Sequence, residues 1–469
     1  MNDNASDTSD AVREEGRADG GAPPRGGVTL ALTSAATAVA LMTYTAPMVT
    51  LPETAAALHT PPSAQAWLLN GTPLGLAALL LVGGSLADDY GRRRIFVSGT
   101  FALGLTTVLG AFATSTWFFT LARVAQGAAS AALLASSLGL IVHAFPTARG
   151  RRHATGVWGA FVSGGIAVGP LLAGALPSWR LAHGVLGVAA LIVAVLSVRG
   201  LAESLSSRGG RPDLAGAVTF GMALVALVAA LTLGRDGWLR ALVLLLLAAA
   251  VLLTAVFVRV ERRSRTPLID LALLRRPRFL ASSAGGLFTG FAVIGLFSFL
   301  PTLLQQALGL SPTATAWLFF LWSGLSFVVA LLARHLNDRI SHRLQLVLGF
   351  VLHAAGVLAM LGAVDAGSWP RLLPGLVVAG VGSGLLNAAL PLLAVDSVPA
   401  ARAAMGSGAQ QSLRYIGSCA GVALTIALTA SARDLARGTD VAMAVSAGLA
   451  LVAAAGVAGL RDKRRVSTR

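Results

Sequence analysis

The chain has 469 residues, of which 55% are apolar and only 12% are charged, against roughly a quarter charged in an ordinary soluble domain. This composition excludes an ordinary soluble protein. The net charge of +16 would suit a nucleic-acid-binding protein, but the arginines stand in short stretches between apolar segments, so we expect no nucleic-acid partner.

The first 26 residues are predicted to form a disordered cytoplasmic tail, because acidic and basic residues mix there with Gly and Pro and no apolar run occurs. The first apolar stretch starts near residue 28. It is too long and too far from the start for a cleavable signal, so we expect it to remain in the mature protein.

Apolar stretches then follow one another from residue 28 to residue 460, each near the ~20 residues that a helix needs to cross a bilayer. Lipid offers the backbone no hydrogen-bond partners, so these stretches must be helices. We predict an all-α polytopic membrane protein with about fourteen transmembrane helices. Their expected ranges are 28–50, 66–86, 95–114, 117–142, 157–177, 181–198, 214–233, 239–258, 280–304, 316–333, 344–364, 372–395, 405–430 and 441–460.

Basic residues gather in every second connection, and this alternation predicts the orientation in the membrane. By the positive-inside rule both termini are cytoplasmic. We therefore expect a multi-pass protein of the plasma membrane, and the abundance of Arg, Ala and Gly favours a high-GC, bacterial genome. The basic connections are 92–94, 149–152, 199–211, 259–278, 334–343 and the tail 461–469.

The predicted organisation is two six-helix halves, 27–198 and 261–460, separated by two inserted helices within 199–260 and followed by a basic cytoplasmic tail, 461–469. Residues 86–93 and 336–343 follow the second helix of each half and are alike. They place Asp338 where the first half has Asp88. Internal duplication of this kind is typical of transporters.

Residues 84–94 put small residues at a helix end, then a carboxylate, a tight turn and three arginines. This pattern resembles the signature loop of the major facilitator superfamily, which implies a conformational switch. Asp88 can pair with an arginine or face a helix N-terminus in one conformation and separate in another. A simple stop signal would explain the arginines but not Asp88 or the glycines. The matching residues are Gly84, Asp88, Gly91, Arg92 and Arg93.

An arginine stands about two turns into the predicted helix 117–142. Arg123 has Gln126 and Gly127 on the same face, and a charge at membrane depth needs a partner or a cavity. The segment resembles the superfamily's helix-4 motif, whose arginine is associated with proton transfer in antiporters. The alternative is an arginine that snorkels to lipid headgroups.

Glycines in the predicted helix 157–177 follow a spacing that resembles the pattern of exporters in the superfamily, with Ala173 in place of one glycine. Small residues four apart allow two helix backbones to approach closely, and a proline bends the helix. Generic helix packing is the alternative. The residues are Gly156, Gly165, Gly169, Pro170 and Gly174.

Further stretches resemble the fourteen-helix drug:proton antiporter family, among them 51–52, 178–180, 266–270, 300–301 and Arg414. One departure concerns proton coupling, because the family's acid before the Leu-Pro step is replaced here by Thr43 and Tyr44. The remaining coupling candidates are Glu53, Asp88, Arg123 and Gln126, with His183 and His353 less favoured.

The leading prediction is a secondary exporter of amphipathic compounds, driven by protons and working as a monomer. An importer or facilitator is the alternative, and the pattern of helix 157–177 argues against it. A membrane-embedded enzyme would need a cluster of acids or histidines or a nucleophile dyad. The sequence shows none, so we expect no enzyme activity, no cofactor and no metal. Cys419, the single cysteine, is interpreted as a packing residue.

Arg123 and Arg414 are the ionisable residues expected at the depth of a central cavity, with no carboxylate at the same depth to balance them. This imbalance favours neutral or weakly acidic substrates over lipophilic cations. Solvation of the two arginines by Gln126 and by residues 410–412 is the alternative.

Overall fold

The computed structural model describes residues 26–203, 214–234, 239–264, 273, 276–333, 340–398 and 403–460, and within these ranges every regular element is a helix. The expected tail 461–469 lies outside the described residues, as does the tail 1–26 except for Gly26, which begins the first helix. The all-helical prediction is therefore confirmed for the described part of the chain.

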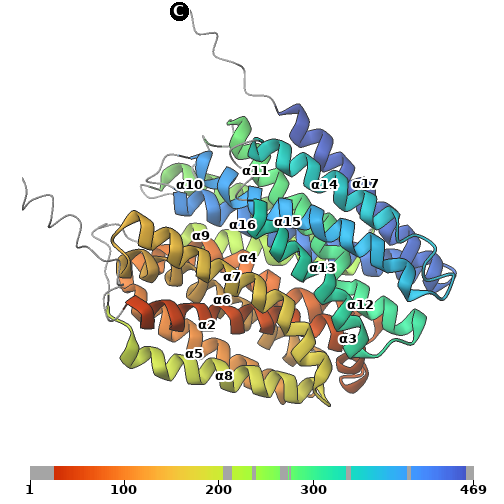
Figure 1. Cartoon of the computed structure of the whole chain (residues 1–469), viewed down its shortest axis with the longest axis horizontal. Coiled ribbons are helices and arrows are strands. Elements are labelled where there is room, and N and C mark those ends of the chain that lie inside the picture. The colour runs from red at the N-terminus through yellow and green to blue at the C-terminus, as the bar shows by residue number, and fades with distance from the viewer. Residues whose placement is uncertain are drawn as a thin grey trace, which may run out of the picture.

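The first group of helices forms the lower part of the view in Figure 1. The second group forms the upper part, and two further helices separate the groups in sequence. The first group contains α2 (Gly26–Thr45), α3 (Pro47–Ala57), α4 (Gln65–Tyr90), α5 (Arg92–Ala111), α6 (Thr116–Ala144), α7 (Ala148–Ala175) and α8 (Trp179–Gly200). The separating helices are α9 (Leu214–Gly234) and α10 (Ala241–Arg263). The second group contains α11 (Pro277–Phe288), the π-helical segment η3 (Thr289–Ile294), α12 (Gly295–Leu308), α13 (Pro312–Ala333), α14 (His342–Leu358), α15 (Leu372–Asp396), α16 (Ala403–Ser431) and α17 (Leu435–Gly459).

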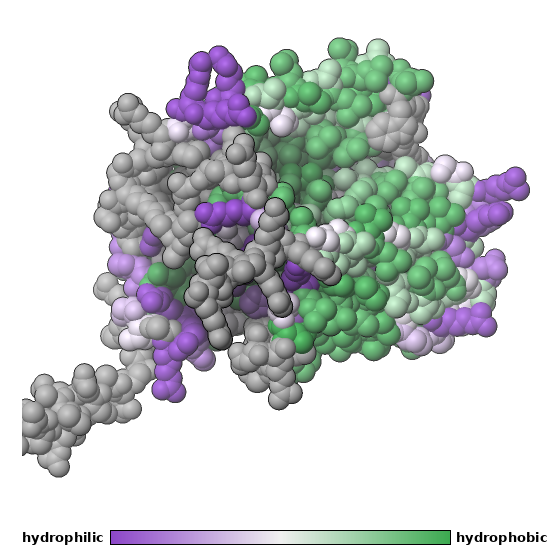
Figure 2. Space-filling view, turned by 90° about the horizontal axis from the view of Figure 1, so that it is seen from above, coloured by the Kyte–Doolittle hydropathy of each residue, from purple (hydrophilic) through white to green (hydrophobic). Residues whose placement is uncertain are grey.

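The surface is that of a membrane protein. In Figure 2 apolar residues cover the middle of the face shown, and hydrophilic side chains lie at its two ends. Large apolar side chains such as Val195 and Val251 are exposed on α8 and α10, where lipid would cover them. Among the described residues, 11 helices are long and apolar enough to cross a bilayer, and shorter apolar helices cover Val218–Gly234 and His342–Leu358. The count of fourteen stays a prediction.

The first membrane segment is broken, where the sequence predicted one helix over 28–50. Helix α2 ends at Thr45 and α3 begins at Pro47. Proline has no N–H, so Pro47 cannot donate to the Thr43 carbonyl four residues earlier. The break therefore leaves a carbonyl that needs another partner in the middle of the protein.

A second interruption lies in the predicted helix 280–304, which the structure shows as α11, η3 and α12. Gly286, Gly290 and Gly295 all face α16: a Cβ atom on Gly290 would lie 1.9 Å from the Arg414 carbonyl oxygen, and one on Gly295 would lie 2.5 Å from Gly421 Cα. The glycine spacing is four and then five residues. A π-turn, with its i→i+5 hydrogen bonds, accommodates the extra residue and keeps all three glycines on one face.

The two groups meet along α4 with α16 and along α7 with α13. Between α4 and α16 the Asn70 amide donates to the Cys419 carbonyl at 3.0 Å, and the Cys419 thiol donates back to the Asn70 carbonyl at 3.8 Å. The Gln305 amide donates to the Val49 carbonyl at 2.8 Å, near the end of the bundle that carries the connection 58–64. The described hydrogen bonds between the groups thus lie in the middle of the bundle or toward this 58–64 end.

Candidate functional site

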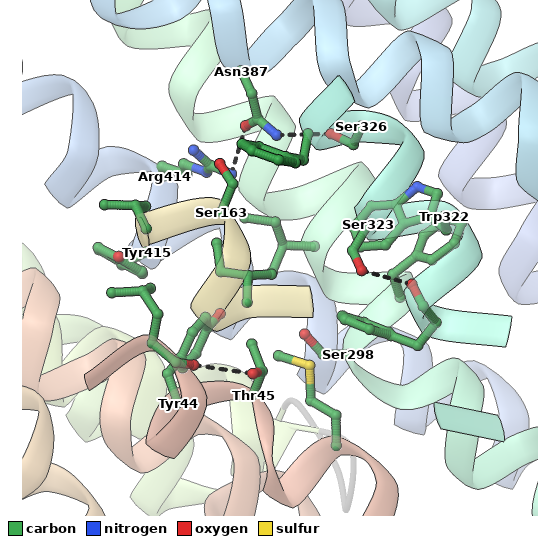
Figure 3. Close-up of a pocket in the computed structure, with 18 of the residues that line it drawn as sticks. Tyr44, Thr45, Ser163, Ser298, Trp322, Ser323, Ser326, Asn387, Arg414 and Tyr415 are labelled. Carbon is green, nitrogen blue, oxygen red and sulfur yellow. Dashed lines mark hydrogen bonds between the residues drawn. The ribbon is translucent and has the colours of Figure 1, made fainter. Parts of the chain in front are cut away.

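A pocket lies between the two groups, in the middle of the bundle (Figure 3). It encloses about 770 Å³ of empty space, counting the part open to solvent. The lining residues come from both groups: Leu41, Tyr44, Thr45, Met48, Val162, Ser163 and Ile166 from the first, and Ile294, Phe297, Ser298, Phe319, Trp322, Ser323, Ser326, Phe327, Asn387, Gln411, Arg414 and Tyr415 from the second.

One corner of the pocket is polar. Arg414 on α16 donates from Nη2 to Asn387 Oδ1 on α15 at 2.9 Å, and Asn387 Nδ2 donates to Ser326 Oγ on α13 at 3.1 Å. Figure 3 shows the three side chains as one chain of hydrogen bonds. Because Asn387 contributes a neutral amide, the chain orients the guanidinium without neutralising it.

The remaining walls combine aromatic and aliphatic side chains with the hydroxyl groups of Thr45, Ser163, Ser298 and Ser323. Phe297 stacks on Trp322 with ring centroids 4.1 Å apart, and Phe319 meets Trp322 at 5.3 Å. Tyr44 from the first group contacts Tyr415 from the second in a T-shaped pair at 6.1 Å. Flat, apolar walls of this kind bind flat, apolar ligand surfaces.

Arg123 does not line this pocket; its side chain is 0% exposed. Its Nη1 donates to the Thr43 carbonyl at 2.6 Å and to Gln126 Oε1 at 3.1 Å, and its Nη2 donates to the Tyr44 carbonyl at 3.2 Å. The guanidinium thus supplies the hydrogen bond that Pro47 cannot give to Thr43.

Tyr44 connects Arg123 with the pocket. Its carbonyl accepts from Arg123, while its ring lines the pocket and its hydroxyl lies 3.5 Å from Ser418 Oγ of the second group. Arg123 is therefore a positioning residue for the pocket wall. The sequence indicated that Arg123 needs a partner, but not that the partner is a backbone broken by a proline 76 positions away in the chain.

The predicted switch loop forms a tight turn at Gly91, whose φ of +102° suits glycine. Helix α4 extends to Tyr90, so Gly84 and Asp88 lie in its last two turns rather than in a loop. Arg92 Nη1 donates to the Gly139 carbonyl on α6 at 3.2 Å, and Arg93 donates to the Val198 carbonyl at the end of α8. Cations at helix C-termini are favoured by the helix dipole.

Glu203, beyond the end of α8, also holds this turn and was not expected from the sequence. The Arg93 backbone N–H donates to Glu203 Oε1 at 3.1 Å, and Arg94 Nε lies 3.7 Å from Glu203 Oε2. The Arg94 side chain is 79% exposed, so this ion pair contributes little to stability. Only the three-dimensional proximity of α5 and α8 identifies Glu203.

The second group repeats the arginine contact. Arg343 at the start of α14 donates from Nε to the Val457 carbonyl at 2.8 Å and from Nη2 to the Ala458 carbonyl, both at the end of α17. Arg93 and Arg343 occupy matching positions in the two similar stretches of sequence. Asp338, the predicted counterpart of Asp88, lies outside the described residues.

The glycines of α7 divide into two sets. A Cβ atom on Gly165 or Gly169 would lie 2.6 Å from the Ala38 carbonyl oxygen and 2.4 Å from Thr45 Oγ1 of α2, and one on Gly174 would lie 2.9 Å from the Pro312 carbonyl oxygen of α13. Gly156 has open space around it. Pro170 lies inside α7. The predicted close approach therefore occurs at three of the four glycines.

The other proton-coupling candidates lie away from the pocket lining. Glu53 is exposed on α3 and accepts from the Trp179 backbone N–H at 3.2 Å, at the start of α8. His183 packs among Phe119 and Trp179, and His353 Nε2 lies 3.4 Å from Ser446 Oγ. Among the described residues, no group of three or more His, Cys, Asp or Glu residues could hold a metal ion.

Known proteins resemble this chain in sequence and in fold. The family model of the Major Facilitator Superfamily matches residues 33–213 and 214–422. The multidrug resistance protein Stp of Mycobacterium tuberculosis is 33% identical over 76% of this chain and 67% of its own. The puromycin resistance protein pur8 of Streptomyces alboniger is 33% identical over 93% of this chain and 88% of its own.

Among solved structures, a bacterial homologue of the human lysosomal transporter Spinster, in an inward-facing and unoccupied conformation, superposes with a TM-score of 0.67. It covers 95% of this chain and 100% of its own at 16% identity, which shows a shared fold. With the matched family model and the identity to Stp and pur8, these findings lead to one conclusion: the chain belongs to the Major Facilitator Superfamily.

Proposed function

We propose that this protein exports amphipathic organic molecules across a bacterial plasma membrane, in exchange for protons, as a monomer. The observation that carries the proposal is the pocket between the two helix groups, because its aromatic rings and the charged group at one corner suit a ligand with an apolar body and one polar end. Relatives named for resistance to puromycin and to several drugs support export as the direction.

The proposed organisation has two halves of common origin, 27–198 and 261–460, with α9 and α10 inserted between them. The equivalent contacts of Arg93 with the end of α8 and of Arg343 with the end of α17 support this duplication. Transporters built from repeats bind substrate where the repeats meet and alternate access by moving one against the other. The pocket lies at such a boundary.

The proposed orientation places both termini in the cytoplasm, from the positive-inside rule. The 58–64 end then faces outward, and the hydrogen bonds between the two groups lie in the middle and toward that end. An exporter takes up its substrate while its pocket is closed on the outer side, and these hydrogen bonds would hold the pocket in that state.

Uptake by inverted membrane vesicles tests the proposed function. Vesicles that contain the protein are expected to accumulate a fluorescent amphiphile when their interior is acidified, and to stop when nigericin collapses the pH gradient. Vesicles from the same host without the protein are the control. Accumulation that persists when the pH gradient and the membrane potential are both collapsed would contradict proton exchange, and uptake only by right-side-out vesicles would instead support an importer.

Replacing Asp88 with asparagine tests the proposed switch at the Gly91 turn. We expect at least tenfold slower transport with normal membrane insertion. The loss of one charge lowers the stability of a large fold only slightly, but it changes the balanced equilibrium between two conformations by a large factor. Vesicle uptake and the amount of monodisperse purified protein are the two measurements. The neighbouring Asp89→Asn is the control, and normal transport by both variants would contradict a switch role for Asp88.

A further inference from the structure

We propose that the pocket selects aromatic acids: a carboxylate or phenolate of the ligand binds Arg414, and its ring system lies among Tyr44, Phe297 and Trp322. This inference rests on the proposed export function for its biological use. Its physical basis is the charge and geometry of the pocket alone.

The charge of the lining is unbalanced. Among the described residues that line the pocket, Arg414 is the one charged side chain and no carboxylate accompanies it. Arg414 forms no ion pair within the part of the chain that the structure describes. A cation at membrane depth is costly without a counter-charge, and the neutral Asn387 offsets that cost only in part. An anionic ligand would supply the missing charge.

The hydrogen-bond chain prepares Arg414 for this role. Asn387 uses its carbonyl oxygen to accept from Arg414 and its amide hydrogens to donate to Ser326, so the guanidinium is held from one side by a fixed partner. A guanidinium carries five N–H donors in a planar fork that matches a carboxylate. The structure assigns one of them to Asn387.

Aromatic walls also attract cations, so the two effects must be weighed. A ring face stabilises a cation by a modest amount, because the ring carries only a quadrupole. A full positive charge in the same low-dielectric pocket repels a cation more strongly and over a longer distance. The charge of Arg414 therefore determines the sign of the charge on the preferred ligand, and the aromatic rings determine the preferred shape.

Arg123 makes no direct contact with the pocket, although the sequence suggested both arginines for this role. Its Nη1 and Nη2 donate to the Thr43 and Tyr44 carbonyls and to Gln126, and the side chain is fully buried behind the pocket wall. The two arginines thus have separate tasks: Arg123 holds the wall and Arg414 binds the ligand. The proposal predicts that direct binding of the ligand's acid group depends on Arg414.

Three fluorescent probes of one shape test the proposal: anthracene-2-carboxylate, 2-(hydroxymethyl)anthracene and 2-(aminomethyl)anthracene, which are anionic, neutral and cationic at pH 7.5. Binding is measured by fluorescence with the purified full-length protein. For the wild type we expect the carboxylate to bind at least about tenfold more tightly than the cation, as a charge-assisted hydrogen bond implies. The neutral alcohol should fall between them.

Variants identify the residues responsible. Arg414→Gln is expected to weaken carboxylate binding by about tenfold or more and to leave alcohol binding nearly unchanged, whereas Arg414→Lys keeps part of the preference. Phe297→Leu should weaken all three probes by similar factors. Equal binding of the three probes by the wild type, tighter binding of the cation, or no binding of the carboxylate would overturn the proposal without requiring any variant to fold.

This test is separate from that of the export function. Selective carboxylate binding that depends on Arg414, in a protein that fails to concentrate any substrate in vesicles, would refute proton-driven export and leave the aromatic-acid site standing. Proton-driven transport of cations that Arg414→Gln does not alter would refute the aromatic-acid site and leave export standing.

Discussion

Leucine in place of Gly169 is expected to reduce transport to background. A Cβ atom at this position would lie 2.4 Å from Thr45 Oγ1 and 2.7 Å from Met42 Cα, so a larger side chain must push α7 away from α2. Thr45 and Met48 on the α2–α3 segment line the pocket, as do Val162 and Ile166 on α7. Separating the helices therefore deforms the pocket itself. Vesicle uptake at equal protein amounts measures the effect.

Gly156→Leu is the matched control for this prediction. It lies in the same helix and the same predicted glycine pattern, but the structure shows open space where its side chain would be. We expect near-normal transport and a melting temperature within a few degrees of the wild type, as for other surface substitutions. Equal loss of transport in both variants would show that the glycines act through helix flexibility rather than through close packing.

Methionine in place of Arg123 is expected to lower stability and to slow transport at least tenfold. The change leaves the Thr43 and Tyr44 carbonyls without their side-chain donor, and each buried unsatisfied group costs about 1–3 kcal/mol. Removing a buried charge recovers part of that cost. The net effect on folding is therefore moderate, whereas the pocket wall at Tyr44 loses its support. Melting temperature and uptake are the two measurements.

Arg123→Lys separates charge from geometry. An ammonium keeps the charge but cannot present the planar fork that reaches two carbonyls, so we expect intermediate stability and intermediate transport. A lysine variant with full stability but no response to the pH gradient would instead favour a direct role for Arg123 in proton transfer. Full transport by Arg123→Met would contradict both roles.

The sequence predicted the all-helical membrane fold, because apolar length and the cost of unpaired backbone groups in lipid depend only on local composition. It also located the turn at Gly91 and the close approach at Gly165 and Gly169. The two helix interruptions were missed, although both have local signals. Pro47 removes a donor, and the spacing of Gly286, Gly290 and Gly295 departs from the α-helical period.

The pocket could not be derived from the sequence in the same way. Asn387 and Ser326 are ordinary polar residues of predicted membrane helices, and they acquire a role only through the hydrogen-bond chain that joins Ser326 to Asn387 and Asn387 to Arg414. Arg123 and Arg414 looked equivalent as intramembrane charges. Their different partners, backbone carbonyls in one case and a side-chain amide in the other, come from tertiary packing.

The interruptions at Pro47 and at η3 have a mechanical consequence for a transport cycle. Each group begins with a helical segment that is interrupted part-way along its length, and the pocket lies beside both interruptions. Beyond these interruptions, the short helices α3 and α12 lie against each other at the 58–64 end (Figure 1). The hydrogen bond from the Gln305 amide to the Val49 carbonyl connects them. A bend at the two interruptions would separate α3 from α12, while the glycine contacts of α2 with α7 and of α11 with α16 stay in place. Bending of these two segments would thus add a local opening of that end to the movement of one half against the other.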